Sequence, residues 1–199
     1  MNRFFHYAYF VLAPICRFLF PMRVVGTENV PEGAAVLCPN HANAFDPALV
    51  AVALGNDSRM SFMAKEELFR RKPIAWFLSK LGAFPVNRGG NDLNAMKTAM
   101  KSLQSGGRLL VFPEGTRVER HGEVEAKGGV IVIASRTNAP LVPVYCGGKK
   151  KLFRKNTVVF GEPYLPTFAS RRPTAEETQQ AANELMDRVY KMREVNGWT

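Results

Sequence analysis

One histidine and one aspartate lie five positions apart in the stretch CPNHANAFDPAL, residues 38–49. A histidine with its ordinary pKa near ~6.5 can accept a proton at neutral pH and then return it. A carboxylate that binds the far ring nitrogen fixes the tautomer and stabilises the imidazolium. His41 and Asp46 are therefore candidates for a general base and the residue that orients it. The same stretch also has a purely structural interpretation, with Asp46 as a helix N-cap and Pro47 as the first helical residue.

Two further polar stretches, NRGG and PEGTR, also follow apolar runs that predict strands. In open α/β sheets, ligand sites gather at the carboxyl ends of the strands. We therefore expect PNHANAFD, NRGG and PEGTR to lie at one edge of a sheet and to form one site.

The elements that position these stretches alternate between short apolar runs and helical patterns, which is typical of an α/β fold. The apolar runs are mostly continuous, as in strands buried on both faces. Strands are predicted over residues 34–38, 60–64, 83–86, 108–112, 141–146 and 157–160.

Two helices are predicted from apolar residues that recur at helical spacing. The first covers residues 92–107 and ends near Gly106, with a core face of Leu93, Met96, Met100 and Leu103. The second covers residues 174–195 and opens with a Thr174/Glu177 capping box. Its apolar stripe is Leu185, Met186, Val189 and Met192, and we expect it to pack without a part in chemistry.

The length and composition predict one domain, since 199 residues with 46% hydrophobic content can build one substantial core. The predicted fold is a single α/β domain with a mostly parallel or mixed buried sheet flanked by helices. Three widely spaced cysteines form no C-x-x-C pair and no cluster with the three histidines. This pattern favours reduced thiols, a cytoplasmic location and no structural zinc.

The net charge of +10 suggests an anionic partner, because excess positive charge attracts nucleic acid, anionic lipid or phosphorylated substrates. The positive charge is concentrated in residues 59–72 and 147–155, with a further pair at Arg171–Arg172. Solvated surface charge explains each run as well as binding does. No helix-turn-helix, zinc-finger or RNP pattern accompanies them, so we expect no nucleic acid partner. Anionic lipid or a phosphorylated substrate remains as the expected partner.

The N-terminal residues 4–20 are nearly all apolar and aromatic, but they are shorter than the ~20 apolar residues of a membrane-spanning helix. A helix lying in the membrane interface fits this composition best, with a buried core helix as the alternative. The expected organisation is a membrane-associated segment over residues 1–22 and a catalytic domain over residues 23–199.

Four ordered blocks carry a resemblance to a known family: NHANAFDP, GAFPVNR, FPEGTR and LVPV, within residues 40–144. They resemble the glycerolipid acyltransferase family, and within it the bacterial 1-acyl-sn-glycerol-3-phosphate acyltransferases. This chain departs from the family at Asn87, where aspartate is common, and at Val118, where serine is frequent. It keeps the family's Lys127-Gly128 pair but lacks an aromatic residue before it.

The resemblance implies roles for further residues. Arg88 and Arg117 are the family's candidates for binding the substrate phosphate. Glu114 is expected in the acceptor site, where it would hold a glycerol hydroxyl or brace an arginine, and Gly115 and Thr116 form its turn. Lys65 resembles a lysine near the oxyanion in many relatives, although a solvated lysine at a helix start is an equal interpretation.

The implied reaction moves an acyl chain from acyl-CoA or acyl carrier protein to the sn-2 hydroxyl of 1-acyl-sn-glycerol 3-phosphate (lysophosphatidic acid), giving phosphatidic acid for phospholipid synthesis. It needs no cofactor beyond the acyl donor as co-substrate. The expected location is the cytoplasmic face of the cell membrane, as a monotopic or peripheral protein on an anionic surface. The alternatives are an acyltransferase for another lysophospholipid or glycerol 3-phosphate, and a catalytically silent lipid-binding protein. A serine hydrolase would need a G-x-S-x-G elbow, which the sequence lacks.

Overall fold

Short apolar runs pair side by side into one central sheet. The computed structural model describes residues 3–57, 59–87, 92–147, 152–168, 170 and 173–195. Within these residues, seven strands form a sheet in the order β1-β7-β6-β2-β5-β3-β4. The strands are β1 (Met22–Val25), β2 (Ala35–Pro39), β3 (Met60–Lys65), β4 (Ala83–Val86), β5 (Arg108–Leu110), β6 (Leu141–Cys146) and β7 (Asn156–Phe160).

The sheet is mixed and mostly parallel, as the sequence predicts. Strands β6, β2, β5, β3 and β4 run in one direction, and β7 pairs antiparallel with β6. β1 pairs parallel with β7 at the edge of the sheet. The carboxyl ends of β2, β5, β3 and β4 therefore lie at one edge, where PNHANAFD follows β2 and PEGTR follows β5. Of NRGG, Asn87 follows β4 at this edge, and residues 88–90 lie outside the described residues.

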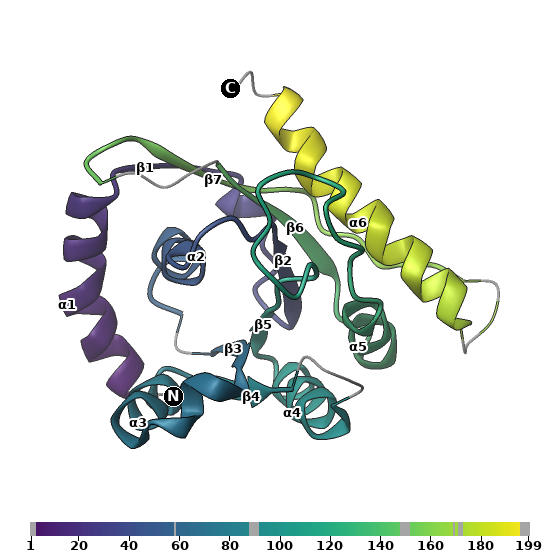
Figure 1. Cartoon of the computed structure of the whole chain (residues 1–199), viewed down its shortest axis with the longest axis horizontal. Helices are drawn as coiled ribbons and strands as arrows, with labels where there is room; N and C mark the ends of the chain where they lie inside the picture. Colours follow the sequence, from purple (N-terminus) through teal and green to yellow (C-terminus); the bar gives the residue numbers. More distant parts are fainter. Residues whose placement is uncertain are drawn as a thin grey trace.

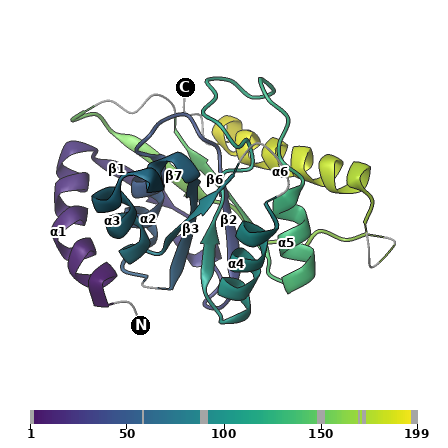
Figure 2. The same ribbon diagram turned by 60° about the horizontal axis from the view of Figure 1, so that its bottom comes forward.

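Helices cover both faces of the sheet (Figure 1). Figure 1 shows α1 and α2 on one face, α5 and α6 on the other, and Figure 2 shows α1 and α6 on opposite sides of the molecule. The helices are α1 (Arg3–Leu19), η1 (Thr27–Asn29), α2 (Asp46–Leu54), η2 (Glu66–Arg70), α3 (Lys72–Lys80), α4 (Leu93–Gln104), α5 (Gly129–Thr137) and α6 (Ala175–Val195).

Strand β2 divides its side chains between two apolar cores. Val36 and Cys38 pack into the core beneath α4, α5 and α6. Ala35 and Leu37 pack into the core on the α2 face. All four side chains are fully buried, which explains why the strand reads as a continuous apolar run.

Helix α6 follows its prediction, whereas α4 departs from it in part. The Thr174 and Glu177 side chains each accept a hydrogen bond from the other residue's backbone N–H, as in a capping box. In α4 the prediction for Leu93 was wrong, because this side chain is 64% exposed at the start of the helix. The buried face of α4 consists of Ala95, Ala99 and Leu103, and Met96 and Met100 are partly buried beside this face.

Helix α1 lies over α2 and buries Phe5 and Ala13. Its outer face remains apolar and exposed, with Tyr7, Phe10 and Phe18 each about 70% accessible (72%, 69% and 71%). No helix among the described residues is long and apolar enough to cross a membrane.

Candidate active site

The turn after β2 begins with a buried asparagine. The Asn40 side-chain amide donates to the carbonyl of Cys146 at 3.1 Å, and its oxygen accepts from the Cys146 N–H at 2.7 Å. These two bonds join the end of β2 to the end of β6. The residue that follows, His41, therefore starts from a fixed backbone position.

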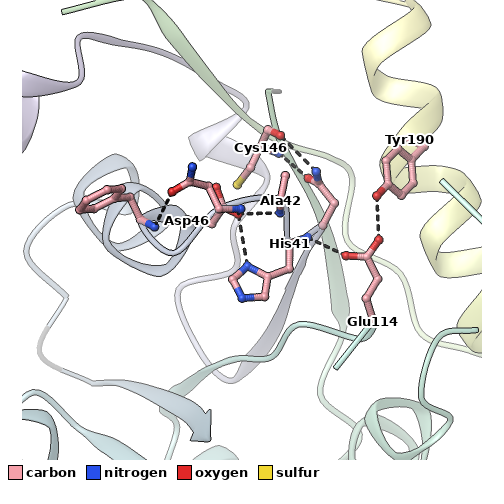
Figure 3. A network of polar contacts seen from close by, with 9 residues as sticks. His41, Ala42, Asp46, Glu114, Cys146 and Tyr190 are labelled. Carbon is pink, nitrogen blue, oxygen red and sulfur yellow. Dashed lines mark hydrogen bonds and ion pairs between the residues drawn. The ribbon is translucent and has the colours of Figure 1, made fainter. Parts of the chain in front are cut away.

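His41 and Asp46 contact each other within this turn (Figure 3). His41 Nδ1 lies 3.2 Å from Asp46 Oδ2, and the two residues are 8% and 0% exposed. The same oxygen accepts the backbone N–H groups of Ala42 at 2.8 Å and Asn43 at 2.6 Å. A carboxylate at Nδ1 favours the tautomer that carries its proton there, which leaves Nε2 as the basic nitrogen.

The N-cap interpretation of Asp46 was wrong. Helix α2 begins at Asp46 itself, and the preceding Phe45 provides no side-chain cap. The carboxylate instead turns back toward the loop, because three donors converge there on one buried oxygen. Pro47 does lie in the first turn of the helix, where the backbone N–H that proline lacks would have no partner within the helix.

The turn after β5 places Glu114 against the His41 backbone. Glu114 is 5% exposed, and its Oε2 accepts the His41 N–H at 2.7 Å. Its Oε1 accepts the hydroxyl of Tyr190, from α6, at 2.7 Å (Figure 3). Burial raises the pKa of Glu114, while the Tyr190 and His41 hydrogen bonds act in the opposite direction. Neither contact is with an arginine, and the expected acceptor role of Glu114 stays a prediction.

The rest of this turn also holds His41 in place. Gly115 has a positive φ of 66° and donates its N–H to the Phe112 carbonyl at 3.0 Å. The Val118 N–H donates to the His41 carbonyl at 2.8 Å. Both the N–H and the carbonyl of His41 are therefore bound by the turn that follows β5, called the second turn below; the turn that follows β2 is called the first turn. Thr116 and Arg117 lie between these contacts and are exposed.

The other predicted binding residues are less constrained. Lys65 ends β3, is exposed, and places Nζ 3.2 Å from Glu67 Oε1. Arg88 lies outside the described residues. Of its described neighbours, Asn87 donates its N–H to Asp92 Oδ2 at 2.9 Å. Asp92 also caps α4.

Tyr190 is the site residue that the sequence analysis missed. It comes directly after Val189, a residue of the apolar stripe of α6, and is partly buried. This helix was predicted to pack without a part in chemistry. A tyrosine beside a buried face usually has a hydrogen-bond partner for its hydroxyl, and this was the available signal. The partner, Glu114, is 76 residues away and cannot be inferred from local spacing.

An apolar cavity of about 350 Å³ reaches this site from between α1, α2, α3 and the sheet. Ala44 and Pro47 of the first turn line it, together with Phe112, whose ring centroid lies 4.1 Å from that of His41. A second cavity of about 380 Å³ lies near α4 and α5 and also contacts Phe112. The described part of the chain contains no group of three or more histidine, cysteine, aspartate or glutamate side chains that would hold a metal ion.

The site thus combines a buried histidine–aspartate pair with an apolar cavity at the carboxyl edge of a mixed sheet. Residues 21–147 match the family described as Acyltransferase. This chain belongs to the acyltransferase family. The acyltransferase is 32% identical over 177 residues to 1-acyl-sn-glycerol-3-phosphate acyltransferase of Bacillus subtilis, covering 86% of this chain and 87% of that protein. It is also 32% identical over 129 residues to the Streptococcus pneumoniae protein of the same name, covering 63% of this chain and 47% of the relative.

A solved structure has the same fold. The acyltransferase is similar to PlsC, the 1-acyl-sn-glycerophosphate (LPA) acyltransferase of Thermotoga maritima, with a TM-score of 0.66 and 25% identity. The similarity covers 96% of this chain and 78% of that one. The resemblance drawn from the four sequence blocks is thus confirmed at the level of family and fold.

Proposed function

We propose that this acyltransferase transfers an acyl chain from acyl-CoA or acyl carrier protein to the sn-2 hydroxyl of 1-acyl-sn-glycerol 3-phosphate. The product would be phosphatidic acid. The observation that carries the proposal is the buried His41–Asp46 contact of 3.2 Å beside an apolar cavity. The names of the relatives from Bacillus subtilis and Streptococcus pneumoniae support the choice of acceptor.

In the proposed mechanism the acceptor hydroxyl attacks the thioester carbonyl while His41 Nε2 removes its proton. The new carbon–oxygen bond forms, the carbon–sulfur bond breaks, and His41 returns the proton to the departing thiolate. Asp46 stabilises the imidazolium between these two transfers. The substrate hydroxyl is the nucleophile, so the reaction needs no acyl-enzyme intermediate and no cofactor beyond the acyl donor.

The apolar cavity is suited to an acyl chain. Its lining residues are mainly alanine, leucine and aromatic side chains from α1, α2, α3 and the sheet. An alkyl chain there would leave water, with about 0.8 kcal/mol gained for each buried CH₂. Because Phe112 lines the cavity and also contacts the His41 ring, a chain bound in the cavity would present its carboxyl end near the base.

The acceptor phosphate requires cations, and Arg117 and Arg88 are the proposed ligands. The guanidinium group is planar and binds phosphate oxygens in a bidentate manner. Arg117 is exposed and makes no hydrogen bond or ion pair with any residue the structure describes, so its side chain can turn toward a ligand. Lys65 would act near the oxyanion, and Glu114 would shape the acceptor side of the turn.

The decisive experiment is a substrate panel on the full-length protein. Lysophosphatidic acid, glycerol 3-phosphate and a lysophospholipid with a choline headgroup are each incubated with acyl-CoA and with acyl carrier protein. Mass spectrometry identifies the lipid product. Phosphatidic acid as the main product supports the proposal, and preference for another acceptor replaces it with one of the alternatives. Lipid binding without any product would indicate a catalytically silent protein.

We also propose that α1 docks the enzyme on an anionic membrane surface. Tyr7, Phe10 and Phe18 form an exposed apolar face on this helix. Leu152 and Phe153 extend it, since they are 56% and 61% exposed and the Phe153 ring packs edge-on against Phe18. Exposed basic residues directly follow Phe153 and lie at the start of α3, and each cation near a charged leaflet contributes about 1 kcal/mol. They are Arg70, Arg71, Lys72, Arg154 and Lys155, whereas residues 148–151 and Arg171–Arg172 lie outside the described part.

Vesicle flotation tests this docking without removing the helix, because deletion of α1 would uncover α2. The test variant replaces Tyr7, Phe10 and Phe18 by serine, and Leu93→Ser removes an equally exposed apolar group from α4. We expect the triple variant to lose most of its binding to anionic vesicles and Leu93→Ser to keep it. Salt should weaken the remaining binding, since charges are screened over ~8 Å at physiological ionic strength. Equal flotation of the triple variant and the unmodified protein would place the anchor elsewhere.

A further inference from the structure

The C-terminal helix reaches the candidate active site through a single hydroxyl. Tyr190 of α6 donates to Glu114 Oε1, and Glu114 Oε2 accepts the His41 N–H, each at 2.7 Å. A continuous path therefore joins α6 to the backbone of the proposed base (Figure 3).

The Tyr190 ring is itself fixed from outside. The His121 ring stacks on it with 4.4 Å between centroids, and His121 Nε2 lies 3.0 Å from Asp187 Oδ1 on the same helix. A tyrosine held in this way loses little further rotamer freedom when it donates its hydrogen bond. The hydroxyl is thus preorganised toward Glu114.

Glu114 depends on this donor because it is almost completely buried. Without the Tyr190 hydroxyl, Oε1 would have no hydrogen-bond donor among the described residues. A buried charged acceptor without a donor is strongly disfavoured, so the carboxyl group would rotate or take up a proton. Either response weakens the bond that holds the His41 N–H.

We infer that Tyr190 is a positioning residue for acyl transfer, holding Glu114 so that its other oxygen fixes the His41 backbone and keeps the imidazole against Asp46. This inference rests on the proposed function. Tyr190 does not touch the reacting atoms, and it acts through Glu114. Truncation of its hydroxyl should therefore lower kcat and leave substrate KM nearly unchanged.

The dependence on pH gives this role a distinctive signature. Burial raises the pKa of Glu114, the Tyr190 and His41 bonds lower it, and the nearby Asp46 and Glu123 charges raise it further. Burial and Glu114, with smaller effects from Tyr145 and Glu123, raise the pKa of Tyr190, so the phenol keeps its proton. Loss of the Tyr190 hydroxyl removes one group that favours the carboxylate. The pKa of Glu114 then rises further, and activity should begin to fall at a higher pH on the acid side.

The experiment compares Tyr190→Phe with Tyr164→Phe. Tyr164 also packs against α6, under the Arg188 guanidinium at 4.3 Å, but it has no hydrogen bond to Glu114. We expect kcat to fall about 10-fold in Tyr190→Phe, as for loss of a hydrogen bond to a buried charge. The acid limb should move to higher pH in this variant alone. Unchanged kcat and pH profile in folded Tyr190→Phe, or the same changes in Tyr164→Phe, would overturn the inference.

A double-mutant cycle tests whether the effect passes through Glu114. If it does, Tyr190→Phe costs much less in a Glu114→Gln background than in the unmodified enzyme. A full 10-fold loss again in that background would show that Tyr190 acts elsewhere. All variants are compared well below the lowest of their melting temperatures.

A measurement without substrate separates this inference from the proposed reaction. The His41 backbone amide resonance should titrate with Glu114, because the N–H donates directly to that carboxylate. In Tyr190→Phe the midpoint of the Glu114 component should move to higher pH, and in Glu114→Gln that component should disappear, leaving only the response to the His41 ring itself. This result supports the contact even if the substrate panel fails. An unmoved midpoint in Tyr190→Phe contradicts the inference even if the panel succeeds.

Discussion

The turns after β2 and β5 are neighbours at one edge of the sheet, yet they direct their charged side chains differently. After β2, His41 and Asp46 are both buried and contact each other. After β5, Glu114 turns inward to the His41 backbone, whereas Arg117 is exposed. The first turn encloses all of its charged groups, and the second divides them between the interior and the surface.

This difference agrees with the two tasks proposed for the turns. Proton transfer requires atoms held within hydrogen-bond distance, and burial among backbone N–H donors provides that order. Phosphate binding requires a cation that the phosphate group of the acceptor can reach from outside. The second turn meets both needs because its glutamate supports the base and its arginine faces outward.

The strongest test of the comparison is His41→Ala. Loss of a general base costs about 10²- to 10⁴-fold in rate, and we expect kcat to fall by that amount with KM nearly unchanged. Steady-state kinetics with both substrates and a circular dichroism melt measure the effect and the fold. Full activity in a well-folded variant would show that His41 is not the general base.

A smaller loss is expected from Asp46→Asn. An asparagine can present its N–H₂ to His41 Nδ1, which would favour the opposite tautomer and put the proton on Nε2. We expect kcat to fall about 10²-fold, below the loss for His41→Ala. A ¹⁵N NMR spectrum of the imidazole reports the tautomer directly. An unchanged tautomer together with a large loss of activity would indicate that Asp46 acts only by holding the loop.

Arg117→Lys tests the outward part of the second turn. A lysine keeps the charge but loses bidentate geometry, so KM for the acceptor should rise about 10-fold, or about 1.4 kcal/mol, with kcat little changed. Arg120→Lys is the matched control, because Arg120 is exposed in the same loop. If donor and acceptor KM rise equally, Arg117 does not discriminate for the acceptor phosphate.

The smallest effect concerns the turn after β4, where Asp92 joins Asn87 to the start of α4. Asp92→Ala should lower the free energy of unfolding by about 1 kcal/mol through loss of the cap, comparable with Thr174→Ala on α6. The N–H groups of Asn87, Ala95 and Asn94 lower the pKa of Asp92. Its contribution is therefore present above the ordinary aspartate pKa and lost as pH falls through the lowered value. Urea unfolding at several pH values measures this, and a difference that grows in acid would contradict it.

Much of this fold follows from local patterns in the sequence. Strands such as β4 and β6 match their predicted bounds of 83–86 and 141–146, because each is one continuous apolar run. Strand β1 was not predicted, since its MRVV contains an arginine and its partner, residues 156–159, lies far along the chain. Leu93 is spaced from Met96, Met100 and Leu103 as on one helix face, but it is the first residue of α4 and its side chain is exposed.

The candidate site shows the same division between local and distant contacts. The His41–Asp46 contact lies within one turn, so spacing and family resemblance could suggest it. The bonds of Glu114 to His41 and Tyr190 join three distant segments and depend on how α6 packs. The N-cap rule misled for Asp46 because a buried histidine and two loop N–H groups compete for the same carboxylate.

The Asn40 side chain lets the polypeptide leave the sheet early without interrupting its ladder. An amide side chain carries the same donor and acceptor as a peptide unit, and Asn40 uses both on Cys146, as a residue of an antiparallel neighbouring strand would. The sheet therefore gains one extra rung that the backbone of β2 does not supply, and the next residue is free to turn sharply. Aspartate has no N–H for the Cys146 carbonyl, and glutamine is longer by one methylene. Asparagine at this position is thus a peptide mimic whose value is geometric, giving a loop residue the rigidity of a strand.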